Sequence, residues 1–185
     1  MKTINDLING YYTHGRWHND IKEFLNKTTG NYLEIGVFWG YFLAETAINF
    51  PHKKIYGIDP FISDGNLGSE YPLGNSMPGV REVCMTNING LDNIILFECT
   101  TEEFSKNINY EILNSVTCVL VDGSHIYEDV CVDIDLIAKI KNDDEKLIVF
   151  DDLGLPGVDR AMEYFKFKFK DRIKQEISAE KFIIV

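Results

Sequence analysis

The sequence predicts an α/β fold: a doubly wound, mostly parallel, seven-stranded sheet with helices on both faces and a C-terminal antiparallel hairpin. Three observations lead to this expectation. Short apolar runs alternate along the chain with longer stretches of helical periodicity. Two of these runs end abruptly in acidic residues, a pattern typical of strands that deliver side chains to a ligand-binding edge. The chain closes with two short segments separated by a turn, which favours a hairpin.

The expected elements follow one another in a regular order. Residues 1–30 are expected to form a helical cap, because Ile4, Leu7 and Ile8 recur at helical spacing. Five apolar runs predict the parallel strands: Tyr32–Ile35, Lys54–Ile58, Asn93–Phe97, Thr117–Val121 and Lys146–Phe150. Amphipathic stretches predict helices over residues 39–50, 80–90, 126–138 and 158–165. Two closing segments predict the hairpin strands: Arg172–Ile177 and Lys181–Val185.

One long stretch interrupts this alternation. Residues 60–78 are rich in glycine, serine, proline and asparagine and show no periodicity. Loops of this length in a compact domain usually bind ligands or act as lids, so we expect a substrate or lid loop here. No linker or internal repeat divides the sequence, and residues 1–185 are expected to form a single domain.

The composition restricts the classes of partner. The formal net charge is −11, which argues against binding to nucleic acid or to an anionic membrane surface, since both require a basic face. No apolar run approaches the ~20 residues of a membrane span, and the first residues do not resemble a signal peptide. We therefore expect a cytoplasmic protein. The four cysteines contain no Cys-x-x-Cys pair, which argues against a zinc or redox centre.

A glycine-containing turn and an acid mark a candidate cofactor site. Gly36 directly follows the first predicted strand and allows a tight turn close to a ligand, while Gly40 allows the next helix to pack near the strand. Asp59 ends the second strand, where an acid can accept hydrogen bonds from ribose hydroxyls. The G-x-G-x-x-G fingerprint of dinucleotide-binding folds is absent.

Acids and a histidine end two further strands. The strand Thr117–Val121 runs into Asp122 and, three residues later, His125, and the strand ending at Phe150 runs into Asp151 and Asp152. Parallel strands bring their carboxyl ends to one edge, so these side chains are expected to meet. Oxygen ligands suit Mg²⁺, which would lower the pKa of a hydroxyl, and a histidine can remove its proton near neutral pH.

Together these segments resemble a known family. The pattern Glu34-x-Gly36-x-x-x-Gly40, then Asp59, Asp122-Gly-Ser-His-x-Tyr127 and Asp151-Asp152, is similar to class I S-adenosylmethionine-dependent methyltransferases, over residues 31–165. The nearest likeness is to the branch of macrocin O-methyltransferase-like sugar enzymes (methyltransferase domain 24). The resemblance implies a Rossmann-like fold and S-adenosylmethionine as cofactor. The cofactor-binding positions that it implies are Glu34, Gly36, Val37, Phe38, Gly40, Asp59, Pro60, Phe61, Thr100 and Asp122.

The resemblance also implies a reaction. A small hydroxylated acceptor, such as a sugar, would be O-methylated with the help of Mg²⁺. The implied metal ligands are Asp122, Asp151 and Asp152, with His125 as the general base and Asp122 between cofactor and metal as a further catalytic residue.

One residue departs from the family pattern, and several assignments of function and assembly stay open. Phe42 stands where many relatives carry a serine that meets the methionine carboxylate of the cofactor. Trp17 and His18 belong to a polar and aromatic cluster that either covers a ligand or starts a helix. Two alternatives remain: a non-catalytic cofactor-binding domain of the same fold, and an NAD-dependent oxidoreductase. A homodimer is also expected, from the aromatic N-terminus and a small exposed sheet edge.

Overall fold

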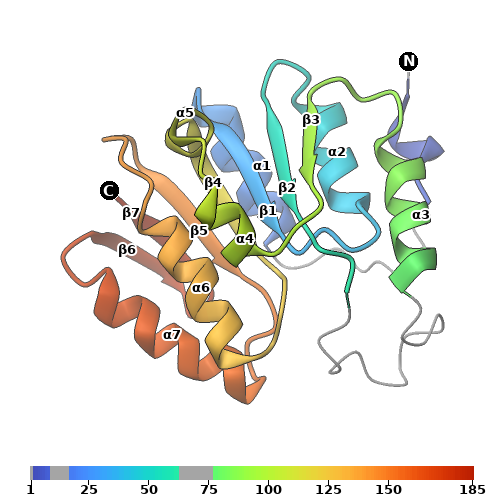
Figure 1. Cartoon of the computed structure of the whole chain (residues 1–185). Helices are drawn as coiled ribbons and strands as arrows, with labels where there is room; N and C mark the ends of the chain where they lie inside the picture. The colour runs from blue at the N-terminus through green and yellow to red at the C-terminus, as the bar shows by residue number, and fades with distance from the viewer. Residues whose placement is uncertain (1, 9–16, 63–76) are drawn as a thin grey trace.

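The computed structural model describes residues 2–8, 17–62 and 77–185 (Figure 1). Its core is one seven-stranded sheet in the order β3-β2-β1-β4-β5-β7-β6. The strands are β1 (Asn31–Ile35), β2 (Ile55–Ile58), β3 (Ile94–Phe97), β4 (Val116–Val121), β5 (Lys146–Phe150), β6 (Ile173–Ser178) and β7 (Lys181–Ile184). The helices are α1 (His18–Lys27), α2 (Tyr41–Asn49), α3 (Met77–Ile88), α4 (Thr101–Lys106), α5 (Tyr110–Asn114), α6 (Tyr127–Ile137) and α7 (Pro156–Lys168).

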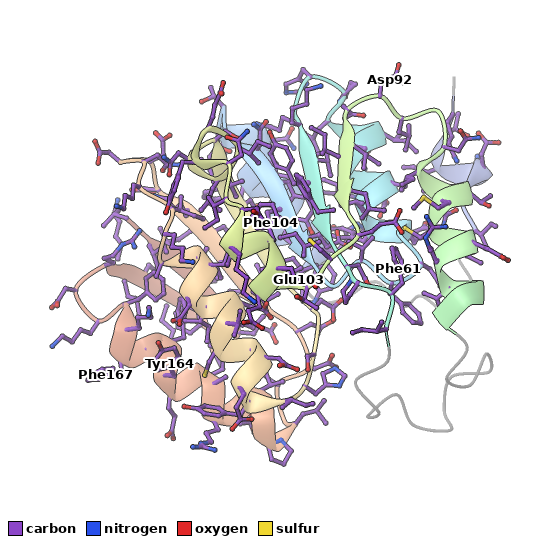
Figure 2. The ribbon with its side chains drawn as sticks, viewed as in Figure 1. Phe61, Asp92, Glu103, Phe104, Tyr164 and Phe167 are labelled. Atoms are coloured by element: carbon purple, nitrogen blue, oxygen red, sulfur yellow. The ribbon has the colours of Figure 1, made fainter. Side chains whose placement is uncertain are left out.

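Helices cover both faces of the sheet, as the sequence predicted. Figure 1 shows α4, α6 and α7 in front of the strands and α1 and α2 behind them. Alternation along β4 divides the core accordingly: Val119 and Val121 pack toward α4–α7, while Cys118 and Leu120 pack toward α1–α3. In Figure 2 the side chain of Phe104 on α4 is directed at the sheet, where its ring contacts Phe97 at a centroid distance of 4.9 Å.

The strand order reverses at β1. The chain leaves β1 for β2 and β3 on one side and returns on the other side as β4 and β5, all four neighbouring pairs being parallel. Ile35 at the end of β1 pairs with Ile58 of β2 and with Val121 of β4. The segments that follow these strands therefore emerge together at the carboxyl edge, at the reversal point where open α/β sheets bind ligands.

The C-terminal hairpin is confirmed. Strand β7 runs antiparallel to β5, with Ile183 opposite Leu147, and β6 lies at the outer edge of the sheet. Phe182 is fully buried against α7, where its ring lies 4.9 Å from Phe165. The hairpin therefore extends the hydrophobic core without contributing to the carboxyl edge of β1 and β4.

The N-terminal helical cap is partly wrong. Residues Ile4–Asp6 form a single 3-10 turn, and Leu7 is already extended. The backbone of Ile8 bonds instead to a side chain distant in sequence: its N–H donates to Asn87 Oδ1 at 2.7 Å, and its carbonyl accepts from Asn87 Nδ2 at 3.1 Å. The predicted helical pattern over residues 9–16 lies outside the described residues, as do residues 63–76 of the predicted loop.

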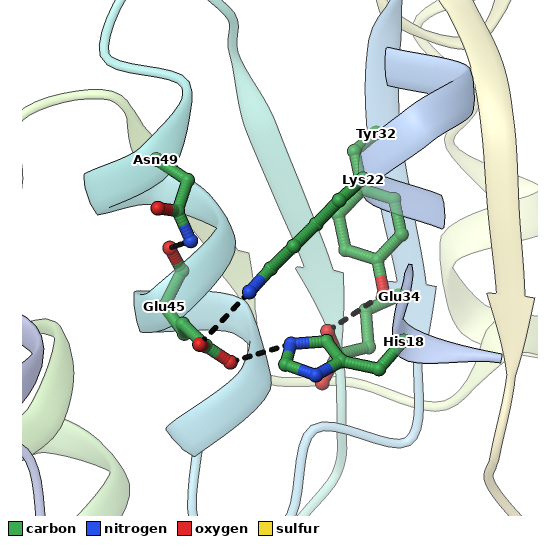
Figure 3. A network of polar contacts seen from close by, with 6 residues as sticks. All are labelled: His18, Lys22, Tyr32, Glu34, Glu45 and Asn49. Carbon is green, nitrogen blue, oxygen red and sulfur yellow. Dashed lines mark hydrogen bonds and ion pairs between the residues drawn. The ribbon is translucent and has the colours of Figure 1, made fainter. Parts of the chain in front are cut away.

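The second helix of the predicted cap, α1, is present and is fixed to α2 by buried charges (Figure 3). Glu45 of α2 lies between His18 and Lys22 of α1, with Nε2–Oε2 and Nζ–Oε1 distances of 2.6 and 3.0 Å. Lys181 of β7 pairs with Asp20 at 2.6 Å on the same helix. These ion pairs hold α1 against the face of the sheet that carries α2.

Helices α4 and α5 were not predicted. Both lie between β3 and β4, and both begin at a capping residue: Thr100 accepts from Glu103 N, and Asn109 accepts from Glu111 N. The sequence Thr100-x-x-Glu103 is a capping box, which is the signal that could have revealed α4. Each helix is only 5 or 6 residues long, too short for apolar periodicity to show it.

Candidate active site at the carboxyl edge of the sheet

The turn after β1 places its backbone against the end of β4. Gly36 has φ +86°, and a Cβ at this position would lie 2.0 Å from the carbonyl oxygen of Asp122. The N–H of Asp122 in turn donates to the Ile35 carbonyl at 2.8 Å. Only glycine fits such a contact. The predicted tight turn at Gly36 is therefore present at the reversal point of the sheet, and the close approach that it allows here is to the backbone of Asp122.

The carboxylate of Asp59 organises the two loops beside this turn. Its Oδ2 accepts from the N–H groups of Val37 and Phe38, both at 2.8 Å, and its Oδ1 accepts from Phe61 N at 2.6 Å. Phe38 and Phe61 have φ values of +50° and +52°, a left-handed backbone that needs support. Amides of the described residues thus use three of about four acceptor positions of the carboxylate.

Glu34 is buried on β1, one strand away from Asp59. The Tyr32 hydroxyl donates to its Oε2 at 2.9 Å (Figure 3). Burial, and to a smaller extent the charge of Asp59, raises the pKa of Glu34 to about 8. The side chain therefore holds a proton at neutral pH until a cation or a donor approaches it.

This shift predicts a pH-dependent stability. Between its ordinary pKa of 4.5 and about 8, the folded chain keeps a proton on Glu34 that the unfolded chain has lost, so the free energy of unfolding falls as pH rises and levels off above that window. Glu34→Gln is expected to remove this fall of up to about 5 kcal/mol. Urea unfolding at pH 5 and pH 9 measures it, with the exposed Glu23→Gln as control; an equal pH dependence in wild type and Glu34→Gln would contradict the assignment.

Asp122 lies at the centre of a group of carboxylates. Burial raises the pKa of Asp122 well above its usual range, and the charges of Asp151, Asp152, Glu34 and Asp59 raise it further. Burial thus favours the protonated form of Asp122, and a cation beside it would favour the ionised form.

His125 and Asp152 meet across the ends of β4 and β5. The His125 Nε2 lies 2.8 Å from Asp152 Oδ2. Asp152 has φ +58°, and its N–H donates to Asp151 Oδ1 at 2.9 Å. A pocket lies at these strand ends, lined by Val121, Asp122, Gly123, Ser124, His125, Val130, Phe150, Asp151, Asp152 and Val158. The structure thus brings together Asp122, His125, Asp151 and Asp152, as the sequence predicted.

The predicted metal site is not formed by this arrangement. Within residues 2–8, 17–62 and 77–185, no group of three or more His, Cys, Asp and Glu side chains is placed to hold a metal ion. The left-handed backbone of Asp152 directs its carboxylate to His125, and Asp151 is engaged by the N–H of its neighbour. The carboxylates of Asp122, Asp151 and Asp152 are oxygen donors of the kind that Mg²⁺ prefers, but in this arrangement they do not converge as ligands of one ion.

Sequence analysis missed Gly157, which fixes the backbone of His125. It occupies the first turn of α7, and a Cβ there would lie 2.1 Å from the His125 carbonyl oxygen and 3.0 Å from Tyr127 N. The dipeptide Pro156-Gly157 indicated only a helix start, because the contact depends on how α7 packs against the loop after β4.

Gly157→Ala is expected to lower kcat about tenfold or more, because the methyl group must displace His125 and small misplacements are costly in active sites. Steady-state kinetics at saturating S-adenosylmethionine measures it. Gly154→Ala is the control, since a Cβ there meets nothing within 4 Å although φ is +103°. An equal kcat for both variants would show that Gly157 does not position the histidine.

The other residues that the resemblance implied as cofactor-binding positions lie at helix starts or in buried and half-buried positions. Thr100 caps α4, with its Oγ1 accepting from Glu103 N at 3.1 Å. Gly40 caps α2 with φ +66°, Pro60 is half-buried, and Phe61 is buried in the core beside α2.

Phe42, which stands where many relatives carry a serine, belongs to the buried core. It is 3% exposed, and its ring packs edge-on against Trp17, His18 and Tyr32 at centroid distances of 4.9, 4.6 and 5.9 Å. Trp17 and His18 accordingly belong to the core at the start of α1, so the helix-start interpretation is right for these two residues.

The sequence matches no protein-family model and no curated protein. The fold is similar to solved O-methyltransferases. NovP gives a TM-score of 0.63 at 17% identity over 90% of this chain and 78% of that chain. CalS11, a TDP-rhamnose 3'-O-methyltransferase, gives 0.60 at 16% over 90% and 76%. An O-methyltransferase from Bacillus cereus in complex with S-adenosylhomocysteine gives 0.62 at 13% over 95% and 82%.

These likenesses establish the fold. The chain has a Rossmann-like fold that it shares with these solved O-methyltransferases, so the fold implied by the resemblance in the sequence is confirmed. In the described parts of the chain, no helix combines the length and apolar character that crossing a membrane requires.

Proposed function

We propose that the protein is an S-adenosylmethionine-dependent O-methyltransferase acting on a small hydroxylated acceptor, such as a sugar. One observation carries the proposal: the Gly36 turn, held by Asp59 and by the backbone of Asp122, lies at the reversal point of the sheet beside the His125–Asp152 pair. The solved structures of similar fold include a TDP-rhamnose 3'-O-methyltransferase, which supports this class of acceptor.

The charge at the sheet edge supports this cofactor. S-adenosylmethionine carries a positive sulfonium, and its methyl group is transferred as that charge is lost. Burial raises the pKa of Glu34, Asp59 and Asp122, and the charge of Asp59 adds to this rise at Glu34 and Asp122, so a cation beside them would favour their ionised forms. The backbone of Gly36 to Phe38 and the remaining acceptor position of Asp59 would hold the cofactor.

The acceptor hydroxyl needs a base, and His125 is placed to be one. Asp152 fixes the orientation of the imidazole through the 2.8 Å contact to Nε2 and stabilises its protonated form. The imidazole of His125 would then take the proton from the acceptor hydroxyl. Transfer needs little beyond this proton acceptor and in-line positioning of the two reactants.

Calorimetric titration tests the cofactor assignment. Wild-type protein is expected to bind S-adenosylmethionine and S-adenosylhomocysteine but not NAD; binding of NAD alone would favour the oxidoreductase. Release of S-adenosylhomocysteine with a panel of sugars and phenolic diols then tests turnover. Binding of S-adenosylmethionine without methylation of any acceptor would favour the non-catalytic domain.

Mg²⁺ assistance and a homodimer remain predictions from the sequence. Turnover that falls after treatment with EDTA and returns with Mg²⁺ would support a metal that binds by rearranging Asp151 and Asp152. Turnover that ignores EDTA would support the histidine–aspartate pair acting alone. Sedimentation equilibrium measures the oligomeric state.

A further inference from the structure

The side chain of Asn87 joins two segments that are far apart in sequence. Asn87 lies on α3 and is fully buried. Its Oδ1 accepts from Ile8 N at 2.7 Å, while its Nδ2 donates to Ile8 O at 3.1 Å and to Trp39 O at 2.9 Å. One amide group thus satisfies the backbone of the N-terminal segment and a carbonyl of the Gly36–Gly40 turn.

Helix α3 contacts the same turn at a second point. Cys84 is one helical turn before Asn87, and a Cβ on Gly40 would lie 2.7 Å from its Sγ. Within the turn, the rings of Phe38 and Trp39 are stacked at 5.2 Å, and Phe38 N donates to Asp59. A shift of Trp39 would therefore reach the amides that Asp59 organises.

The N-terminal segment is anchored on the same helix. Lys2 Nζ donates to the carbonyls of Thr86 and Asn89 near the end of α3, at 2.5 and 3.2 Å. Leu7 is buried against Tyr41 and Ala44 of α2. Residues 2–8 therefore lie over α2 and α3, beside the turn that follows β1.

We propose that Asn87 is a positioning residue that sets the Gly36–Gly40 turn for S-adenosylmethionine and couples cofactor binding to docking of residues 2–8. This inference rests on the proposed function. The physical reason is that both amide protons of Asn87 are used, and a buried carbonyl left without its donor is destabilised. A ligand that fixes the position of the Trp39 carbonyl therefore also favours the docked position of Ile8. By thermodynamic linkage, docking of Ile8 favours binding of that ligand to the same extent.

Asn87→Asp tests the proposal, because aspartate keeps the acceptor for Ile8 N, but when ionised it cannot donate to Trp39 O or to Ile8 O. The Kd for S-adenosylmethionine, measured by calorimetry well below the melting temperature, is expected to rise about tenfold or more, with kcat at saturating cofactor within about threefold. The matched control is Asn107→Asp, the same chemical change at an exposed position directly after α4, outside α3 and the two segments that Asn87 joins. A lower melting temperature with unchanged Kd would overturn the proposal.

A second measurement needs no variant, and it decides the question even where Asn87→Asp does not fold. Amide exchange at Ile8 in the wild type is expected to slow about fivefold or more when S-adenosylmethionine is saturating, the range of typical couplings. Unchanged exchange at Ile8 would overturn the role of Asn87 while leaving the proposed function intact. If the wild type does not bind S-adenosylmethionine, both the role of Asn87 and the proposed function are wrong. Calorimetric titration of the wild type with S-adenosylmethionine shows this first.

Discussion

Replacing His125 by alanine is expected to lower kcat by roughly 10²–10⁴-fold and to leave the Kd for S-adenosylmethionine within about twofold. In the proposed function the imidazole accepts the proton of the acceptor hydroxyl, and it contacts Asp152 in the pocket at the ends of β4 and β5. Single-turnover release of S-adenosylhomocysteine separates the chemical step from binding.

Two further variants sharpen this expectation. His52→Ala makes the same change at an exposed turn residue and should leave turnover unaltered. Asp152→Asn keeps the size of the side chain and tolerates the left-handed backbone, but removes the charge that stabilises a protonated His125; it should lower kcat about tenfold or more and shift its pH profile. If His125→Ala retains wild-type turnover, the base lies elsewhere.

Gly36→Ala is expected to abolish cofactor binding and to destabilise the fold by several kcal/mol. The added Cβ would lie 2.0 Å from the Asp122 carbonyl oxygen, so the ends of β1 and β4 must separate, and a left-handed alanine costs about 1–2 kcal/mol in addition. Chemical denaturation and calorimetric titration with S-adenosylmethionine measure the two effects.

Gly90→Ala is the matched control for this collision. Its φ is +79°, close to the +86° of Gly36, but a Cβ there meets nothing within 4 Å. The control therefore carries the backbone strain without the clash, and should cost only about 1–2 kcal/mol while leaving cofactor affinity intact. Equal losses in the two variants would show that the close approach to Asp122 is not what makes Gly36 necessary.

The sequence was sufficient to predict the sheet and the edge at which the site lies. Strand β5 has the predicted bounds, Lys146–Phe150, and the other parallel strands differ by one residue at their starts. These runs are continuous, apolar and bounded by turn residues, so local pattern decides them. The same pattern placed Asp122, His125, Asp151 and Asp152 at strand ends that the parallel register then brings together.

What the sequence could not supply are contacts that depend on distant segments. The helical spacing of Ile4 and Leu7 predicted a helix, yet Ile8 is held by Asn87, 79 residues away. Asp59 was expected to accept from a ligand, whereas most of its acceptor positions face amides of the chain itself. Asp152 pairs with His125 and has a positive φ, and neither feature is visible in the periodicity of the sequence.

The bonds of Asp59 also bear on how a ligand arrives. Because the carboxylate holds Val37, Phe38 and Phe61 through the protein's own amides, the backbone at these three residues is preorganised, and they have little conformational entropy left to lose when a ligand binds. Rapid-mixing experiments should therefore show an observed rate that rises linearly with cofactor concentration, without the plateau of a slow isomerisation. Differences in affinity among variants outside this loop would then arise mainly from the dissociation rate.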